Sequence, residues 1–247
     1  MNAPDALLMR DVTKSYGAAT PALDHVSLQV PRGSFLAVMG PSGSGKSTLL
    51  QCAAGLDTPT SGQVFIGGRE ISRLRETKRT LIRRDTIGFV FQSYNLLPSL
   101  TVEENITLPL RLAGADLDRR WMRVVVERIG LAPYLGRRPA ELSGGQQQRA
   151  AIARSLAARP HVVFADEPTG ALDLAAADNV LGLLREVVDD LGQTVVMVTH
   201  DPAAAARAHA TVVLGDGRIR QYLPRPSAEE LTRELSRARS TALARTA

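Results

Sequence analysis

An apolar run that leads into a glycine-rich loop restricts the fold of this chain more than any other feature. The run Phe35–Met39 predicts a buried strand, and residues 40–47 (Gly-Pro-Ser-Gly-Ser-Gly-Lys-Ser) follow it directly. The loop fits the pattern G-x-x-x-x-G-K-[ST], in which glycines let successive backbone N–H groups turn toward phosphate oxygens, Lys46 reaches the β and γ phosphates and Ser47 takes Mg²⁺. Because a helix is predicted from Lys46 onward, phosphate binding is favoured over an ordinary strand-to-helix turn.

A second glycine-rich segment lies much further along the chain, at residues 142–146 (Leu-Ser-Gly-Gly-Gln). Ser143 is a predicted N-cap residue, and Gly144 and Gly145 open a predicted helix. The N-terminus of a helix carries partial positive charge, so this segment has the ingredients of another anion site. One nucleotide needs only one such loop, and the presence of two requires an explanation.

Length and composition suit one large α/β domain, or a core with a subdomain. The 247 residues are 44% hydrophobic, and we expect neither a membrane-spanning helix, for lack of a long apolar run, nor a secretory signal. The single cysteine, Cys52, excludes a disulfide framework or a zinc site built on cysteines. Its place in the helix after the first loop favours a small buried residue in a reducing compartment.

The net charge of +5 is concentrated at the C-terminal end. Residues 218–247 contain seven arginines and three glutamates, which accounts for four of the five net positive charges and leaves the main domain near neutral. Ser227 and Glu230 have capping-box spacing and predict a short helix that carries Leu231 and Leu235. This basic helix is expected either to pack on its own domain or to touch anionic lipid or a partner.

Alternating strand and helix patterns predict a mostly parallel sheet with right-handed crossovers. The predicted strands are residues 7–12, 26–30, 35–39, 63–66, 87–91, 162–165, 194–198 and 211–214. The predicted helices are residues 46–54, about 101–112, 117–129, 144–158 and 175–191. Between Gln92 and Leu142 the strand pattern is missing, so a helical insert is expected there. The two glycine-rich segments therefore belong to different structural units.

Two acids, Asp166 and Glu167, directly follow the apolar run 162–165. Open α/β sheets bind ligands at the carboxyl ends of their strands, and phosphoryl transfer requires a carboxylate for the metal and a group that orients water. Asp166 is therefore a candidate Mg²⁺ ligand, and Glu167 a candidate for polarising the attacking water. The alternative is that the pair caps the next helix or meets an arginine.

Three further residues stand at strand ends and each has two readings. His200 is placed to contact a γ-phosphate and its water, although a histidine at a strand end is usually structural. Gln92 can coordinate Mg²⁺ and move with the helical insert, or be a simple loop residue. Tyr16 can stack on adenine or pack on the sheet. No chemistry is assigned to the remaining histidines, which are His25, His161 and His209.

With these motifs in this order, the chain resembles the nucleotide-binding subunit of an ABC transporter over about residues 6–222. The resemblance implies an α/β P-loop NTPase fold, in which a RecA-like, mostly parallel sheet core carries a small antiparallel β part and a helical subdomain at about residues 93–142. Residues 1–222 would form the ABC ATPase domain and residues 223–247 a basic C-terminal helix or tail. The D-loop, residues 170–173, begins with Gly170 where many relatives have serine.

The resemblance also implies roles for particular residues around ATP and Mg²⁺. The implied catalytic residues are Glu167, His200 and Gln92, and the implied metal ligands are Ser47, Gln92 and Asp166. The implied nucleotide-binding residues are Tyr16, Gly40, Pro41, Ser42, Gly43, Ser44, Gly45, Lys46, Ser47, Thr48, Ser143, Gly144, Gly145, Gln146 and Asp173. In the family, two subunits face head to tail, and each ATP lies between the phosphate loop of one and the signature segment of the other. Two glycine-rich segments would then serve one nucleotide.

Residues 55–62, 91–98 and 166–170 are similar to the MacB/LolD/FtsE branch of the family. That branch implies a MacB- or FtsX-like permease partner, a peripheral position on the cytoplasmic face of the cell membrane, and a role in export or in lipoprotein, lipid or peptide extraction. The partner is expected to dock near residues 93–100, unless the leucines there only fill the insert. Neither the substrate, its direction of transport nor the identity of the permease follows from the sequence.

Two other functions compete with transport. An ABC-type ATPase acting on nucleic acid or ribosomes is disfavoured, because relatives of that kind carry long coiled coils, tandem domains or zinc-binding cysteines, and no nucleic-acid partner is expected. An FtsE-like regulatory ATPase, which controls an extracytoplasmic enzyme through its membrane partner without transport, would use the same ATPase residues. That alternative stays open at the level of the sequence.

Overall fold

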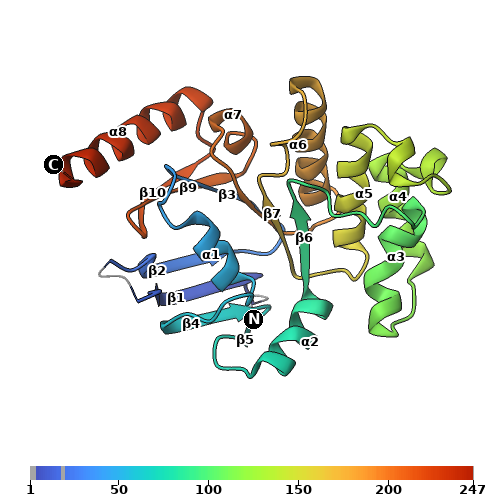
Figure 1. Cartoon of the computed structure of the whole chain (residues 1–247), viewed down its shortest axis with the longest axis horizontal. Coiled ribbons are helices and arrows are strands. Elements are labelled where there is room, and N and C mark those ends of the chain that lie inside the picture. The colour runs from blue at the N-terminus through green and yellow to red at the C-terminus, as the bar shows by residue number, and fades with distance from the viewer. Residues whose placement is uncertain (1–3, 18–19, 247) are drawn as a thin grey trace.

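The helix that follows the first glycine-rich loop, α1 (Lys46–Ala53), lies between two β-sheets, as Figure 1 shows. The computed structural model describes residues 4–17 and 20–246, without the side chains of residues 239–246. One sheet has six strands in the order β10-β9-β3-β8-β7-β6, and the other has four in the order β2-β1-β4-β5. The expected combination of a sheet core with a smaller β part is therefore present.

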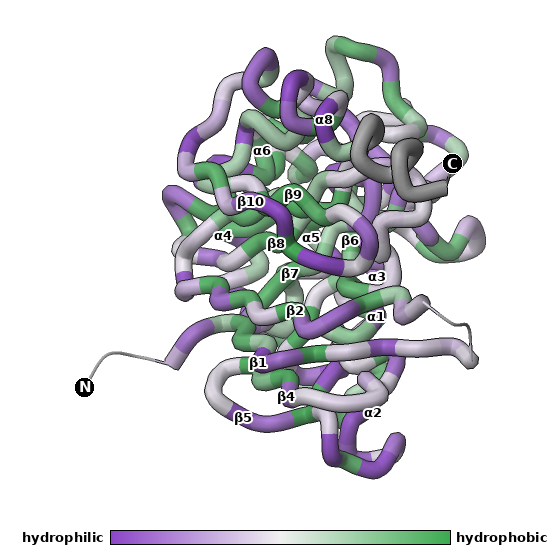
Figure 2. Tube along the Cα trace, turned by 90° about the vertical axis from the view of Figure 1, so that its left-hand side faces the viewer, coloured by the Kyte–Doolittle hydropathy of each residue, from purple (hydrophilic) through white to green (hydrophobic). Residues whose placement is uncertain are grey.

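The six-stranded sheet is parallel except at one edge. Its strands are β3 (Phe35–Met39), β6 (Ile87–Phe91), β7 (Val162–Asp166), β8 (Val195–Val198), β9 (Ala210–Gly215) and β10 (Arg218–Pro224). Only the β9–β10 pair is antiparallel within the described residues. Parallel strands are covered on both faces, which explains why the central strands are nearly continuous apolar runs. Figure 2 shows this hydrophobic character gathered on the central strands and a more hydrophilic β10.

Strand β3 divides the hydrophobic core in two, because successive side chains of a strand point to opposite faces. Phe35, Ala37 and Met39 pack on the side of the large helices. Leu36 and Val38 face α1 and the antiparallel sheet, where Cys52 is also buried, as predicted. The loop that follows β3 is therefore held from both sides by packed structure.

The smaller sheet is antiparallel throughout and covers α1 on the side away from β3. Its strands are β1 (Leu7–Lys14), β2 (Leu23–Val30), β4 (Ser61–Ile66) and β5 (Arg69–Glu70). Buried residues alternate with exposed ones along β2, as expected for a sheet with one solvated face. This alternation made most of β2 and β4 recognisable in the sequence.

Helices occupy the stretch that the sequence predicted to be free of strands, and they lie beyond β6 in Figure 1. The stretch holds α3 (Val102–Ala113), α4 (Arg119–Ile129) and short 3-10 turns at Ala132–Tyr134 and Pro139–Glu141. Helices α5 (Gly144–Leu156) and α6 (Leu174–Asp189) follow. The capping box predicted at Thr101 is confirmed, since its hydroxyl accepts a hydrogen bond from Glu104 N and its N–H donates to Glu104 Oε2.

Besides the two-residue strand β5 and the short 3-10 turns, one helix and one strand escaped the sequence analysis, for different reasons. Helix α2 (Glu76–Thr86) is almost entirely polar, and only Arg79 and Ile82 are buried on it, so no apolar periodicity marks it. Strand β10 alternates between half-buried and exposed residues, and it continues past residue 222, the proposed end of the ATPase domain. The Asp216-Gly217 pair, which follows the apolar run 211–214, was a turn signal that could have indicated a hairpin with β10.

The C-terminal helix α8 (Ala228–Thr246) packs on the domain that precedes it. Ser227 Oγ accepts a hydrogen bond from Glu230 N at 3.1 Å, in agreement with the predicted helix start. Leu231 and Leu235 are buried in the same core as residues of the short helix α7 (Pro202–Ala205). Of the two readings of this segment, packing on its own domain is the one observed. Across residues 4–17 and 20–246, no helix has both the length and the apolar content needed to span a bilayer.

A buried asparagine fastens the chain ahead of α3. The side chain of Asn105 is inaccessible to solvent. Its Oδ1 accepts from Leu97 N at 2.7 Å, and its Nδ2 donates to the carbonyl oxygens of Leu97 at 3.0 Å and Leu100 at 3.2 Å. The Asn105 side chain thus provides hydrogen-bond partners for backbone groups of residues 97–100, which belong to no helix or strand.

Replacing Asn105 with alanine should lower the free energy of unfolding by about 2–4 kcal/mol, because buried backbone groups lose their partners. Chemical denaturation measures the loss. Thr107→Ala, on the same helix, removes a hydroxyl that donates to Glu103 O on the exposed side and should cost less than about 1 kcal/mol. Equal losses in the two variants would show that the Asn105 bonds have no special weight.

Candidate nucleotide-binding site

The first glycine-rich loop and the ends of β7 and β8 line one cavity of about 500 Å³. The lining residues are Ala22, Gly40, Pro41, Ser42, Gly43, Gly45, Lys46, Ser47, Thr48, Asp166, Glu167, Val198, His200 and Leu235. Apart from Ala22, Val198 and Leu235, every one of them was a predicted site residue. Segments far apart in the sequence therefore meet at the carboxyl edge of the parallel sheet, where ligands of such folds bind.

Two glycines of the loop are required by close backbone contacts. A Cβ at Gly40 would lie 2.2 Å from Leu214 O, and a Cβ at Gly45 would lie 2.3 Å from Ala22 O. Gly45 also has a φ of 100°, a left-handed conformation that glycine adopts without strain. Among the described residues, no side chain caps the N-terminus of α1. The first N–H groups of α1 thus remain available for an anion.

Lys46 lies across this loop. Its Nζ donates to the carbonyl oxygens of Gly40 and Pro41, each at 2.9 Å. Burial lowers the pKa of Lys46, and the nearby carboxylates of Glu167 and Asp166 oppose that shift. The buried Ser44 Oγ has no hydrogen-bond partner among the described residues, but Ser44 is not among the residues that line the cavity. The half-buried Lys46 cation at the glycine-rich loop suits a phosphate ligand.

Glu167 and His200 form a contacting pair at one wall of the cavity. His200 Nδ1 lies 2.7 Å from Glu167 Oε1, and the His200 backbone N–H donates to the same oxygen at 3.1 Å. Thr199 Oγ1 donates to Glu167 Oε2 at 3.2 Å. The backbone of Glu167 is in the left-handed region, with φ 46°, so these contacts hold a strained residue in place.

Asp166 and Ser47 offer oxygen ligands in the same cavity. Burial raises the pKa of Asp166, and the adjacent Glu167 carboxylate raises it further. The described residues contain no cluster of three or more His, Cys, Asp or Glu side chains suited to a metal. Mg²⁺ usually takes one or two protein oxygens and completes its shell with phosphate and water. The donor set of Asp166 and Ser47 fits that requirement.

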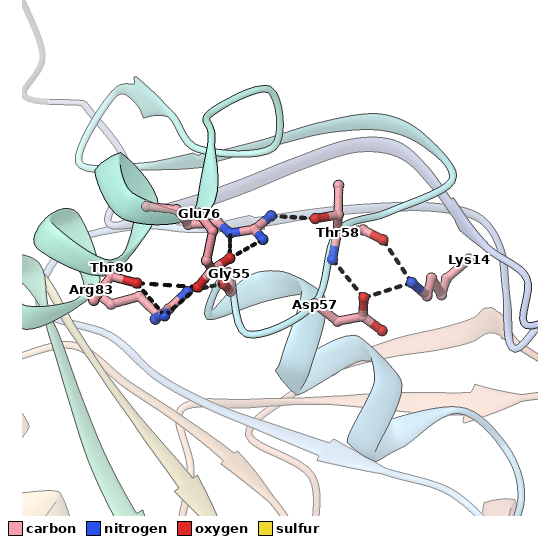
Figure 3. Close-up of polar contacts among 8 residues, drawn as sticks. Lys14, Gly55, Asp57, Thr58, Glu76, Thr80 and Arg83 are labelled. Carbon is pink, nitrogen blue, oxygen red and sulfur yellow. Dashed lines mark hydrogen bonds and ion pairs between the residues drawn. The ribbon is translucent and has the colours of Figure 1, made fainter.

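Tyr16 does not line the cavity. Its hydroxyl donates to Asp57 Oδ2 at 2.8 Å, its ring lies 4.8 Å from Lys14 Nζ, and 57% of the residue is exposed. Lys14 Nζ also donates to Asp57 Oδ1 at 2.6 Å and to Thr58 O at 2.8 Å, as Figure 3 shows. The adenine contact of Tyr16 stays a prediction.

The same close-up shows a second set of contacts, which the sequence analysis missed, at the turn after α1 (Figure 3). Arg83 of α2 donates to Gly55 O at 2.5 Å and to Glu76 Oε1 at 2.8 Å. Hydrogen bonds from Arg79 and Arg83 lower the pKa of Glu76 to about 2. Helix α2 therefore anchors the C-terminal end of the helix that opens at the phosphate loop.

Gln92 lies against the start of the D-loop. A Cβ at Gly170 would be 2.7 Å from Gln92 Nε2, so glycine leaves room for the amide at this position. Serine, which many relatives have there, would force the end of the Gln92 side chain to move. Within the described part of the chain Gln92 is not among the cavity-lining residues, and its metal and catalytic roles stay predictions.

The signature segment forms a separate structural feature. Ser143 Oγ accepts from Gln146 N at 3.3 Å, and Ser143 N donates to Gln146 Oε1 at 2.9 Å, which is a complete capping box. Asp173 Oδ1 accepts from Ala176 N at 2.8 Å and caps α6. The signature residues and Asp173 are absent from the described cavity lining. Ser143, Gln146 and Asp173 take part in helix caps, and nucleotide binding by the signature residues and Asp173 stays a prediction.

Changing Asp166 to asparagine should stabilise the nucleotide-free chain at neutral pH. A raised pKa means that the folded state binds the Asp166 proton more tightly than the unfolded state does. The protonated carboxyl group therefore contributes stability below the unfolded pKa, and this contribution is lost as pH rises through the folded pKa. Asparagine carries no charge at any pH and avoids that loss. The gain should therefore shrink between about pH 7 and about pH 4, near the unfolded pKa. Urea denaturation at both values measures it.

Asp116→Asn, in an exposed loop, is the control and should change stability little at either pH. A loss of stability in the Asp166→Asn variant at neutral pH would show that attraction to Lys46 outweighs burial of the carboxylate.

A family model and curated relatives identify the lineage. The ABC transporter family model matches residues 23–170. The macrolide export ATP-binding/permease protein MacB 1/2 of Paracoccus denitrificans is 49% identical over 199 residues, covering 80% of this chain and 30% of that protein. An ABC transporter ATP-binding protein of Mycobacterium tuberculosis is 47% identical over 199 residues, covering 80% of each chain. The chain spans about a third of the length of the MacB proteins it matches.

Solved structures agree with these relatives. The ATP-binding cassette MJ0796, solved as a dimer in a post-hydrolysis state with ADP and Pi, has a TM-score of 0.76 at 40% identity. The match covers 90% of this chain and 99% of that one. The protein cbiO1 of Clostridium perfringens, part of the ABC transporter complex cbiONQ, has a TM-score of 0.81 at 28% identity, covering 97% and 95%. This chain belongs to the ABC transporter family, as an ATP-binding cassette with the P-loop NTPase fold.

Proposed function

We propose that this cassette hydrolyses ATP as a head-to-tail dimer and so drives a membrane permease. One observation carries the proposal. Residues of the first glycine-rich loop share a cavity with Asp166, Glu167 and His200, whereas the capped signature segment stands apart from it. A single copy thus holds the phosphate-binding and water-activating residues of one site and offers its second glycine segment to another copy.

Within the cavity, the chain's own groups divide the work. The N-terminal amides of α1 and the Lys46 ammonium bind the phosphates. Ser47 and Asp166 would hold Mg²⁺, which neutralises charge on the transferring phosphoryl group when bound. Glu167 polarises the attacking water, and His200, which contacts the Glu167 carboxylate, orients that carboxylate. Gln92 couples the presence of nucleotide in the cavity to the position of the helices beyond β6.

The second copy completes the site. Ser143 and Gly144 open α5, whose N-terminus carries partial positive charge that suits a γ-phosphate. The relative MJ0796 is a dimer in its solved structure. ATP joins the two copies by binding both, and loss of the shared charge on hydrolysis lets them separate. ATP thus acts as substrate and as part of the dimer contact.

A second cavity of about 500 Å³ is a candidate docking site for the permease. It is lined by Thr80, Arg83, Arg84, Ile87, Gly88, Phe89, Phe91, Asn95, Pro109, Arg154, Ser155 and Ala158. It therefore adjoins residues 93–100, where the partner is expected to dock. The permease would be MacB- or FtsX-like, on the same or another chain, and would hold the cassette at the cytoplasmic face of the membrane. The relatives named MacB and PvdT are export ATP-binding/permease proteins, which supports export.

Glu167→Gln should retain ATP binding and lose hydrolysis by at least about a hundredfold, because an amide cannot accept the proton that the carboxylate takes. Closed dimer should accumulate with ATP. Phosphate release and size-exclusion chromatography in ATP measure the two effects. Turnover near that of the unchanged chain would refute the assigned role of Glu167.

Ser143→Arg should block dimer closure, since a bulky cation would occupy the place where the partner's nucleotide meets α5. ATP affinity in the Lys46 half-site should stay within about threefold, because no residue of that cavity changes. Equilibrium dialysis gives the affinity, and sedimentation of the Ser143→Arg/Glu167→Gln variant with ATP gives the dimer fraction. Full dimer formation in that variant would contradict the composite site.

A further inference from the structure

The hydrogen-bonded pairing of β6 and β7 ends just before two of the predicted catalytic residues, Gln92 and Glu167. Strands β6 and β7 run parallel, and their last paired residues are Phe91 and Asp166. Beyond this pair the chain continues to Gln92 on one side and to Glu167 and Pro168 on the other. The backbone ladder therefore ends just where the two proposed catalytic side chains begin.

A side chain from α5 continues the link across this gap. Gln148 is inaccessible to solvent. Its Nε2 donates to Pro168 O at 2.5 Å and lies within hydrogen-bonding distance of Phe91 O at 3.4 Å. One amide group thus connects the residue before Gln92 with the residue after Glu167.

The position is costly for a polar residue. Gln148 Oε1 is buried and has no hydrogen-bond partner among the described residues. An unsatisfied buried carbonyl oxygen destabilises the folded state, and an apolar side chain of the same length would avoid that cost. The benefit of glutamine here is its pair of N–H donors, and these act on the two catalytic segments.

Gln148 also lies on the helix that begins with the signature segment. Helix α5 starts at Gly144 and continues without interruption to Leu156. A helix moves as a rigid body, so a shift of its N-terminus carries Gln148 with it. The Gln92 side chain itself lies against Gly170, three residues after Glu167.

We infer that Gln148 is a positioning residue that couples the two halves of the site within one subunit. When the partner's nucleotide binds Ser143 and Gly144, α5 shifts and the Gln148 amide shifts with it. Through its contacts with Phe91 O and Pro168 O, the amide then positions the backbone next to Gln92 and Glu167. Hydrolysis in one site thereby depends on occupation of the neighbouring site. The inference rests on the proposed dimeric ATPase.

The test is Gln148→Met, which keeps the length of the side chain and removes both donors. The matched control is Gln147→Met, which removes an amide of the same helix that donates to Leu142 O instead. We expect kcat to fall about ten- to a hundredfold in Gln148→Met, with KM within about threefold of the unchanged chain, because misplaced groups slow chemistry more than binding. In the control, kcat should stay within about twofold.

A second measurement separates positioning from structural damage. The Glu167→Gln/Gln148→Met double variant should still form at least about half as much ATP-bound dimer as the Glu167→Gln single variant. An unchanged kcat would overturn the inference, and so would a loss of dimer formation that matches the loss of kcat. If Gln148→Met does not fold, Gln148→Asn keeps the amide on a side chain too short to span both carbonyls and should show the same fall in kcat. Absence of ATP hydrolysis in the unchanged chain would refute the proposed function and with it the role of Gln148, whereas an unchanged kcat in Gln148→Met would refute the role of Gln148 alone.

Discussion

The close approach of the glycine-rich loop to two neighbouring segments supports the rest of the site. The absence of a Cβ at Gly40 lets the loop touch Leu214 O of β9, and its absence at Gly45 lets the start of α1 touch Ala22 O. Gly217 N donates to Ser44 O at 3.1 Å and joins the β9–β10 turn to the same loop. Backbone N–H groups that are to bind an anion must be fixed in direction, and backbone contacts fix them more firmly than flexible side chains do.

Electrostatics in the cavity are balanced against burial. Lys46 is destabilised as a cation by burial and is supported by Glu167 and Asp166. Asp166 in turn has its pKa raised by burial and by Glu167 and is supported by Lys46. One cation and two acids therefore share a half-buried space in which the charge of each side chain influences the pKa of the others.

Much of the fold was predictable because its signals are local. Buried parallel strands such as Ile87–Phe91 are continuous apolar runs, and Thr101 and Ser143 carry the side chains that start helices. Helix α2 was not predictable in this way, since its contacts are ionic and depend on the turn after α1. Asn105 and Gln148 were also missed, because a polar residue in a helix normally indicates solvent and only the packed structure shows that both are buried.

The sequence by itself determined the first glycine-rich loop, the acids Asp166 and Glu167 after the apolar run 162–165, and the resemblance to ABC cassettes, because each depends on residue types at fixed spacing along the chain. The tertiary structure decided which of these residues meet. It placed Asp166, Glu167 and His200 with the first glycine-rich loop and kept Ser143 and Gly144 away from it. Strand order and helix packing bring together residues that are distant in the sequence. The free energy that favours this arrangement comes from burial of apolar surface, which depends on the whole packed structure and cannot be predicted from one position in the sequence.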